Sequence, residues 1–277
     1  MPGTLYLVPT PIGNLSDISD RCRQTLFAAD FIAAEDTRVS IKLLNHLELK
    51  KELVSYHEHN KASSGPRILE RLQNGESCAL VTDAGSPAIS DPGEDLVRLC
   101  AENGVTVCTI PGPCALVTAL SASGLPTGRF CFEGFLSTVK KERTAHLDSL
   151  KTERRTMIFY EAPHRLTATL EALCGAFGAE RKISLCRELT KLHEEYYRTT
   201  LGEAIAHYAE NAPRGEFVLV VEGAQEAPDE TPDLETALGM VSAQMEKGMS
   251  RKDAVKLVSA QTGLKKNVLY DASISAE

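Results

Sequence analysis

The sequence predicts an α/β protein with two consecutive domains and a small helical region after them. Its 277 residues exceed one small domain and suffice for two α/β domains with an appendage. Short apolar strands alternate with helical patterns, as in parallel sheets. An acidic, proline-containing stretch at 224–233 is typical of a linker. We therefore expect an N-terminal α/β domain at 1–122, a second α/β domain at 123–225, and a linker with a helical basic tail at 226–277.

The expected first domain follows from apolar runs and helix signals. Strands are predicted at 4–8, 31–34, 78–83 and 105–110, and a helix at 18–29. A further helix is expected to open at Asp91, with Asp91 as N-cap and Pro92 in the first helical position. For Asp91 the capping role is favoured over a catalytic one. Another helix is expected to begin near Cys114.

The expected second domain begins after a small-residue stretch at 121–128. Strands are predicted near 130–133, 156–161, 183–188 and 217–222, with a helix at 165–177. The tail from 234 to 273 is expected to hold two or three short helices, and residues 250–270 have a helix-turn-helix rhythm. A helical cap and a nucleic-acid-binding module are equally compatible with this tail.

Composition narrows the class of protein. The formal charge of −8 argues against nonspecific coating of nucleic acid and restricts any RNA contact to local basic patches. The eight cysteines form no C-x-x-C pair, and His57-Glu58-His59 has no third ligand in view, so we expect no disulfide framework and no metal. No apolar run has membrane-spanning length and no signal peptide is evident, so a cytoplasmic protein is expected.

Three loops rich in Gly, Pro and small polar residues follow predicted strands, at 9–14, 83–91 and 111–115. Ligands of open α/β sheets bind at the carboxyl ends of strands, and glycine allows the backbone to approach a ligand closely. These loops predict a preformed ligand site. The sequence contains no P-loop, no G-x-G-x-x-G fingerprint, no H-E-x-x-H and no G-x-S-x-G, and these absences disfavour the corresponding classes of site.

An ordered series of motifs resembles one known family. The chain is similar to the ribosomal RNA small-subunit methyltransferase I family, the 16S rRNA cytidine 2′-O-methyltransferases of the tetrapyrrole methylase superfamily. The matching segments are VPTPIGNL at 8–15, AEDTR at 34–38, DAGSPAISDPG at 83–93, PGP at 111–113, EAPHR at 161–165 and RELTK at 187–191. The likeness spans residues 4 to about 223, and the basic C-terminal helices also fit it.

The resemblance implies a two-domain tetrapyrrole methylase-like fold with S-adenosylmethionine in a cleft between the domains, and a homodimer. It implies 2′-O-methylation of a cytidine ribose in 16S rRNA, in the decoding region of the small ribosomal subunit. Cys114 departs from the family, where Ser is common. The cofactor-binding residues that it implies are Pro9, Asp83, Gly85, Ser86, Ile89, Ser90, Cys114, Ala115, Glu161, Ala162, Gly215 and Glu216.

The proposed chemistry needs an aligned hydroxyl oxygen and an acceptor for its proton. Carboxylates suit proton removal, and cationic side chains can orient phosphates or stabilise a developing alkoxide. The candidate bases are Glu35, Asp36 and Glu161. The catalytic set that we predict is Glu161, Asp36, Arg38 and Arg187. Two structural alternatives stay open: Glu161 paired with Arg165 across a strand-to-helix turn, and Asp36 as a helix cap.

RNA contact is expected from local clusters of positive charge. The predicted RNA-binding residues are Lys140, Lys141, Arg143, Arg165, Lys191, Arg251, Lys252, Lys265 and Lys266. Ordinary solvated helix faces explain these charges equally well.

Two other functions are compatible with the sequence. A small-molecule methyltransferase acting on a tetrapyrrole-type ring would have a similar cofactor site. A noncatalytic ribosome-assembly factor would bind cofactor or RNA without turnover. The basic tail favours an RNA substrate over the first, and the intact loops favour catalysis over the second.

Overall fold

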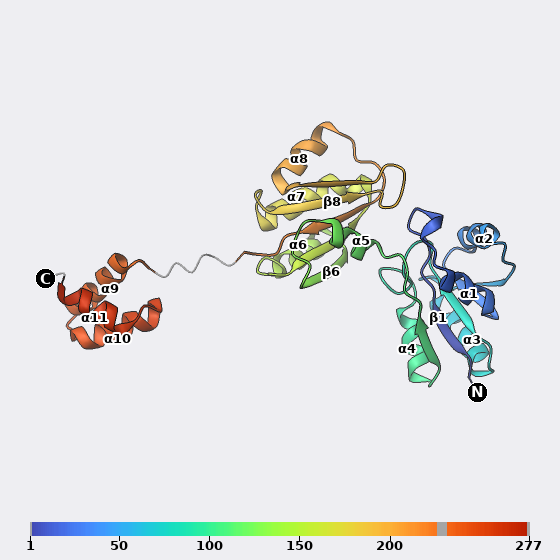
Figure 1. Ribbon diagram of the computed structural model, residues 1–277, viewed down its shortest axis with the longest axis horizontal. Helices are drawn as coiled ribbons and strands as arrows, with labels where there is room; N and C mark the ends of the chain where they lie inside the picture. The colour runs from blue at the N-terminus through green and yellow to red at the C-terminus, as the bar shows by residue number, and fades with distance from the viewer. Residues whose placement is uncertain (1, 226–231, 276–277) are drawn as a thin grey trace. The chain divides into compact units, whose positions relative to one another are not determined.

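A computed structural model of the chain describes residues 2–225 and 232–275. The chain divides into two compact units, Met1–Ala224 and Gln225–Glu277 (Figure 1). The first unit contains two five-stranded sheets, and the second contains helices α9 to α11. Most of the predicted linker at 224–233 lies outside the described residues. The mixed α/β architecture with a helical C-terminal region is confirmed.

The first sheet is entirely parallel and has the strand order β3-β2-β4-β1-β5. β2 and β4 are buried throughout, and both consist of the continuous apolar residues expected of a sheet covered on both faces. The strands are β1 (Thr4–Leu7), β2 (Phe31–Ala34), β3 (Glu52–Ser55), β4 (Cys78–Val81) and β5 (Thr106–Thr109).

Helices cover both faces of this sheet (Figure 1). Leu26 of α1 and Leu44 of α2 pack on one face against Ile32 and Val81. α3 and α4 pack on the other face through their buried leucine, isoleucine and cysteine side chains. The helices are α1 (Asp20–Ala28), α2 (Thr37–His46), α3 (Lys61–Gln73) and α4 (Glu94–Glu102), with a short 3-10 turn at η1 (Leu15–Asp17).

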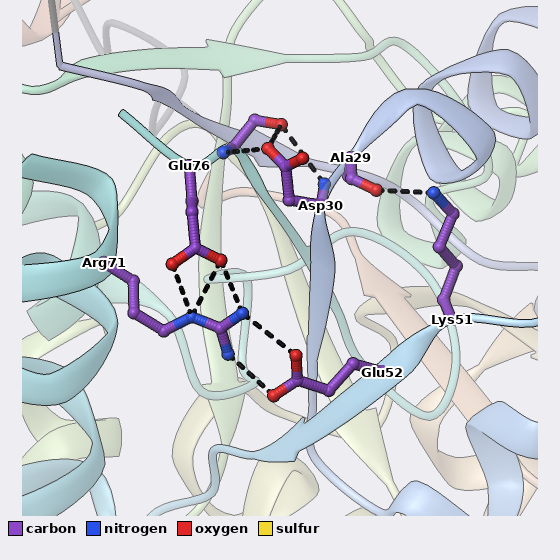
Figure 2. Close-up of polar contacts among 7 residues, drawn as sticks. Ala29, Asp30, Lys51, Glu52, Arg71 and Glu76 are labelled. Carbon is purple, nitrogen blue, oxygen red and sulfur yellow. Dashed lines mark hydrogen bonds and ion pairs between the residues drawn. The ribbon is translucent and has the colours of Figure 1, made fainter. Parts of the chain in front are cut away.

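A polar network ties the amino ends of these strands together (Figure 2). The Arg71 guanidinium of α3 pairs with Glu52 at 2.7 Å and with Glu76 at 2.6 Å, and it stacks 3.6 Å from the centroid of the Phe31 ring. Asp30 accepts hydrogen bonds from both the backbone and the hydroxyl of Ser77. This network lies at the opposite end of the sheet from the predicted ligand loops and therefore stabilises the scaffold.

The second sheet has the order β6-β7-β10-β8-β9, in which only β6 and β7 are parallel. α6, α7 and α8 cover one face. The strands are β6 (Phe130–Phe135), β7 (Thr156–Glu161), β8 (Lys182–Arg187), β9 (Glu195–Thr200) and β10 (Phe217–Val221). The helices are α5 (Ala115–Ala122), α6 (Lys140–Ser149), α7 (Leu166–Phe177) and α8 (Leu201–Glu210), with a 3-10 turn at η2 (Pro163–Arg165).

α5 packs against the second sheet. Its Leu116 and Leu120 share a buried cluster with Ile158 of β7 and with Val218 and Val220 of β10. The division at 1–122, 123–225 and 226–277 remains a prediction. This packing favours a first boundary one helix earlier, near Pro113, because the chain joins the second core before Leu116.

The start of α4 differs from the sequence prediction. The helix begins at Glu94, its N-cap is Gly93, and no side chain caps it. Asp91 as N-cap is therefore wrong. Gly93 has a φ of 149°, and a Cβ there would lie 3.0 Å from the Ala88 nitrogen and from a Leu80 methyl group. Because a φ of 149° is not helical, the helix cannot extend back through Gly93 to Asp91.

The second unit is a three-helix cluster with its own core. α9 (Leu234–Glu246), α10 (Arg251–Thr262) and α11 (Lys266–Ser275) bury Val241, Val258 and Leu269 between them. The Ser250 hydroxyl caps α10 by accepting from the Asp253 nitrogen, and Gly263 ends it in the left-handed conformation. In the described part of the chain, no helix is long and apolar enough to cross a membrane.

Candidate functional site

The first sheet reverses its winding between β1 and β4. The chain leaves β1 towards β2 on one side, and it leaves β4 towards β5 on the other. Such a switch point opens a crevice at the carboxyl ends of the strands. Here the two following loops are joined by paired hydrogen bonds of 2.9 and 3.0 Å between Thr10 and Gly85, and the Thr10 hydroxyl donates to the Thr82 carbonyl. The crevice therefore has a rigid floor.

A cavity of about 260 Å³ lies above this floor. Loops from the first sheet and the ends of β7, β8 and β10 of the second sheet line it. Most of the lining is apolar or consists of small residues, and few polar groups point in, which is typical of a site for an organic ligand. The lining residues are Ile12, Ala84, Gly85, Ser86, Ile89, Ser90, Asp91, Cys114, Ala115, Phe135, Tyr160, Glu161, Ala162, Cys186, Leu189, Lys191, Glu216, Phe217 and Val218.

The loops of the two halves meet at Gly13. A Cβ at this position would lie 2.5 Å from Cγ of Lys191 and 2.8 Å from Oγ1 of Thr190. Only glycine allows this approach. Lys191 in turn pairs with Glu188 at 2.8 Å and with Glu216 at 2.7 Å. These contacts close one side of the cavity.

Backbone strain is concentrated around the cavity. Of the five non-glycine residues with positive φ among the described residues, four lie in two cavity loops: Ala88 (68°), Ser90 (63°), Glu188 (50°) and Thr190 (65°). Such conformations cost of order 1–3 kcal/mol each and persist where the surrounding structure enforces them. Their grouping around one cavity makes these two loops candidates for a functional role.

Aromatic side chains form another wall. The Tyr160 hydroxyl accepts a hydrogen bond from the Leu116 nitrogen at 3.1 Å, which ties β7 to the start of α5. Phe132 and Phe135 meet the Tyr160 ring edge-on, with centroids 4.9 and 5.6 Å away. Phe135 is nevertheless 53% exposed. An exposed aromatic ring at a cavity mouth offers a planar surface to a flat ligand.

Nine of the twelve predicted cofactor residues line the cavity: Gly85, Ser86, Ile89, Ser90, Cys114, Ala115, Glu161, Ala162 and Glu216. Three do not. Pro9 packs against Gly112, Asp83 accepts the Asp36 backbone N–H at 3.1 Å, and Gly215 lies against Glu188. The three support the loops that carry the lining residues.

Glu161 ends β7 with its carboxylate fully buried. One oxygen accepts from the Ala162 nitrogen at 2.9 Å and lies 3.3 Å from Nε of Arg165, and the other accepts from the Thr169 hydroxyl. Arg165 also donates to the Leu136 carbonyl. Both oxygens are thus engaged within the fold, and the structural pairing with Arg165 is present.

The other three predicted catalytic residues lie off the cavity lining. Asp36 caps α2, and both of its carboxylate oxygens accept hydrogen bonds from the Arg38 guanidinium. These hydrogen bonds lower the pKa of Asp36 to about 2. Arg38 is otherwise exposed. Arg187 pairs with Glu195 of β9 at 2.8 Å. A carboxylate with so low a pKa is a weak base, so the geometry gives Asp36 a capping role.

Asp91 is a cavity-lining carboxylate that the sequence assigned to a cap. Burial, followed by the nearby charges of Glu35 and Asp83, raises its pKa to about 7. Burial likewise raises the pKa of Glu35 and that of Asp83. Parallel strands β2 and β4 are neighbours, so the three carboxyl groups after their ends gather at one edge.

Several lining residues were not predicted: Ile12, Ala84, Asp91, Phe135, Tyr160, Cys186, Leu189, Phe217 and Val218. Three of them, Ile12, Ala84 and Leu189, lie within motifs that the sequence analysis singled out, so the sequence could have indicated them. The residues of β6, β7, β8 and β10 carried no such signal. Their inclusion depends on which ends of the second sheet face the loops of the first.

Comparison with known proteins is consistent with this geometry. A family model for tetrapyrrole (corrin/porphyrin) methylases matches residues 4–205, and a model for the RsmI C-terminal HTH domain matches 231–276. A protein named ribosomal RNA small subunit methyltransferase I from Synechocystis is 48% identical over 99% of both chains. One of the same name from Halalkalibacterium halodurans is 49% identical, covering 97% of this chain and 94% of that one. The chain belongs to the ribosomal RNA small subunit methyltransferase I family.

A solved structure shares the fold of this family member at low identity. Uroporphyrin-III C-methyltransferase from Thermus thermophilus, complexed with S-adenyl homocysteine, superposes with a TM-score of 0.57 at 17% identity. The match covers 79% of this chain and 97% of that one. At this identity the likeness concerns the fold alone. In the residues that the structure describes, no group of three His, Cys, Asp or Glu side chains could hold a metal ion.

The predicted RNA-binding residues of this methyltransferase family member fall into three groups. Lys140 and Lys141 are exposed at the start of α6, whereas Arg143 donates to the Ser137 carbonyl. Arg165 and Lys191 are engaged at the cavity, in the pairs described above. In the second unit, Lys252, Lys265 and Lys266 are exposed and Arg251 is half-buried.

Proposed function

We propose that this chain transfers the methyl group of S-adenosylmethionine to the 2′-hydroxyl of a cytidine ribose in 16S rRNA, in the decoding region of the small ribosomal subunit. The single observation that carries the proposal is the cavity at the switch point, in a chain that belongs to this methyltransferase family. The cofactor supplies an electrophilic methyl group on a sulfonium. The chain must supply binding, alignment and proton removal.

The character of the cavity suits this cofactor. Gly85 has a φ of 84°, a left-handed conformation that favours glycine, and it lets the backbone of this loop approach a ligand closely. Small residues such as Ala115 and Ala162 expose backbone groups, while Leu189 and Val218 provide an apolar wall for a nucleoside. A few polar groups in an apolar lining fix orientation.

We propose the nine cavity-lining residues named above as cofactor contacts, with Pro9, Asp83 and Gly215 supporting their loops. Glu161 is proposed as a positioning residue, since its carboxylate holds the Ala162 backbone and Arg165 in place. Alignment of the reacting atoms alone can lower the barrier by up to roughly 7–11 kcal/mol. The rigid floor at Thr10 and Gly85 favours such alignment.

The RNA substrate is proposed to meet two features of the chain. Phe135 offers a stacking surface at the cavity mouth, and stacking on aromatic side chains is a common way to hold an unstacked base. The segment from 247 to 270 contains six Lys or Arg residues and one acidic residue, whereas the whole chain has a formal net charge of −8. We therefore propose that α10 and α11 bind phosphates, together with Lys140 and Lys141.

Two further properties belong to this proposal. We propose a homodimer. Large apolar side chains that are exposed in one chain, such as Phe27, Val117 and Leu192, are compatible with an interface between two copies. A substrate in the small ribosomal subunit would place the protein in the cytoplasm.

The test is methyl transfer from radiolabelled S-adenosylmethionine to small subunits that lack their native methylation, with naked 16S rRNA alongside, followed by mapping. We expect label on one cytidine ribose, with subunits preferred because an acidic enzyme gains from reading shape as well as charge. Label on a base, or on another RNA, would refute the cytidine 2′-O assignment. Cofactor binding without any label would favour a small-molecule substrate or a noncatalytic assembly role.

A further inference from the structure

Three carboxylates line the cavity in the described part of the chain: Asp91, Glu161 and Glu216. Two of them are already engaged. Both oxygens of Glu161 accept hydrogen bonds from the fold. Glu216 is 79% exposed on its side chain and pairs with Lys191 at 2.7 Å. Neither is suited to take up a proton from a substrate.

Asp91 differs from both. None of the described residues donates a hydrogen bond to its carboxylate or forms an ion pair with it. It does not cap α4, which begins three residues later. It follows Ser90, whose φ of 63° is strained for a non-glycine residue. A partly buried carboxylate without a partner costs stability, so its retention at a strained cavity turn calls for a function.

On the basis of the proposed function, we propose that Asp91 is the general base that accepts the proton of the ribose 2′-hydroxyl. As the 2′-oxygen forms its bond to the methyl carbon, its proton passes to an Asp91 oxygen. The carbon–sulfur bond breaks, and its electron pair stays on sulfur. The protonated Asp91 then returns its proton to water. Atoms and charge balance without a further reactant.

The surroundings of Asp91 suit this task. Glu35 after β2 and Asp83 after β4 face it with negative charge, and Tyr160 of β7 is the neighbouring group on the second sheet. Glu35 in turn faces His57 at the end of β3. Lys191, the cationic side chain of the cavity lining, is held by Glu188 and Glu216. Burial and the two carboxylates favour the protonated form, so Asp91 titrates near neutral pH, where a general base is most effective.

The test compares wild type with Asp91→Asn, Asp91→Glu and the control Asp95→Asn. Asp95 lies on α4 and pairs with Lys61 and Arg98, away from the cavity lining. Single-turnover methyl transfer to unmethylated small subunits is measured from pH 6 to 8.5, with binding of S-adenosylhomocysteine measured by calorimetry. We expect the wild-type rate to rise with pH and level off above about 7.

Asp91→Asn should lower the plateau rate by about 10²–10⁴-fold and remove the inflection, while S-adenosylhomocysteine binds within a few fold of wild type. Asp91→Glu should recover part of the rate with its pH dependence, and Asp95→Asn should match wild type. An active wild type with an equally active Asp91→Asn, or an unchanged inflection in that variant, overturns the role of Asp91 alone. A wild type that transfers no methyl group overturns the proposed function and the base assignment together.

Should Asp91→Asn lose S-adenosylhomocysteine binding, the pH profile of Asp91→Glu decides. An inflection displaced from that of wild type supports the assignment. An inflection at the wild-type position overturns it.

Discussion

Replacing Asp91 with Asn should stabilise the fold while it removes the proposed base. The pKa of Asp91 is raised from 3.8 to about 7 in the folded state. A raised carboxyl pKa gives stability that is fully present below the unfolded pKa and is lost as the pH rises through the folded pKa. Wild type should therefore lose stability relative to Asp91→Asn between about pH 4 and pH 7.

The size of this effect follows from the shift. About three pKa units at ~1.36 kcal/mol each set an upper limit of roughly 4 kcal/mol at pH 8. Structural relaxation around a buried charge reduces this, so we expect Asp91→Asn to exceed wild type by about 1–3 kcal/mol at pH 8. At pH 4.5 the difference in stability should fall below about 1 kcal/mol. This pH is only slightly above the unfolded pKa of Asp91, so most of the pH-dependent loss of stability occurs at higher pH.

Urea unfolding of wild type, Asp91→Asn and Asp95→Asn at pH 4.5 and pH 8 measures the difference. Asp95 is the opposite case, since its pairs with Lys61 and Arg98 lower its pKa. Asp95→Asn should therefore be no more stable than wild type at pH 8. If Asp91→Asn differs from wild type equally at both pH values, or is less stable at pH 8, the reasoning on Asp91 is wrong.

Four further changes test other parts of the structure. Arg71→Met should lower the urea midpoint by an amount equivalent to about 1–2 kcal/mol, because Glu52, Glu76 and the Phe31 ring lose their cationic partner. An unchanged midpoint would contradict this. Gly13→Ala should weaken S-adenosylhomocysteine binding in calorimetry by about tenfold or more, because the new Cβ would overlap the Lys191 side chain. Unchanged binding would show that the loops can shift to accommodate the added Cβ. Phe135→Ala should weaken binding to small subunits by about 1–3 kcal/mol in filter assays and leave S-adenosylhomocysteine binding intact, and equal losses in both would argue against base stacking. Glu161→Gln should cost about 1–3 kcal/mol of stability through its lost hydrogen bonds and keep the wild-type pH profile, whereas loss of the inflection would assign it the proton instead.

Local patterns in the sequence predicted much of the fold. β1, β2, β4 and β5 lie within the apolar runs read as strands, and α7 occupies 166–177 where 165–177 was expected. β2 and β4 are buried throughout, and β1 and α7 are buried in part, and burial imposes a hydrophobic pattern on a sequence. β5 is an edge strand without a buried residue, although its half-buried Val107 packs on the core. β9 and α8, at 195–200 and 201–210, were not singled out. β9 is an edge strand with no fully buried residue, so its sequence carries no continuous apolar run.

The motif loops could be read from the sequence because glycine and proline mark close approach and rigid turns locally. Gly85 and Ser86 line the cavity as the spacing of strand and loop suggested. The roles of the carboxylates could not be read in this way. Asp91-Pro92-Gly93 has the composition of a helix start, yet the chain turns at Gly93 and leaves Asp91 in the cavity.

The sequence by itself therefore determined most strands of the first sheet, the loops that line the cavity and the family, because each depends on residues close together in the chain. Only the tertiary structure decided between the alternatives for Glu161 and Asp36 and showed that Asp91 faces the cavity. Glu161 is paired by Arg165 and Thr169 and lies at the end of β7, whereas Asp91 meets Glu35 and Asp83 through the pairing of β2 with β4. Hydrogen bonding, burial and neighbouring charge set the chemistry of a carboxylate. For Asp91, its burial and the charge of Glu35 depend on a strand pairing between segments that are distant in sequence.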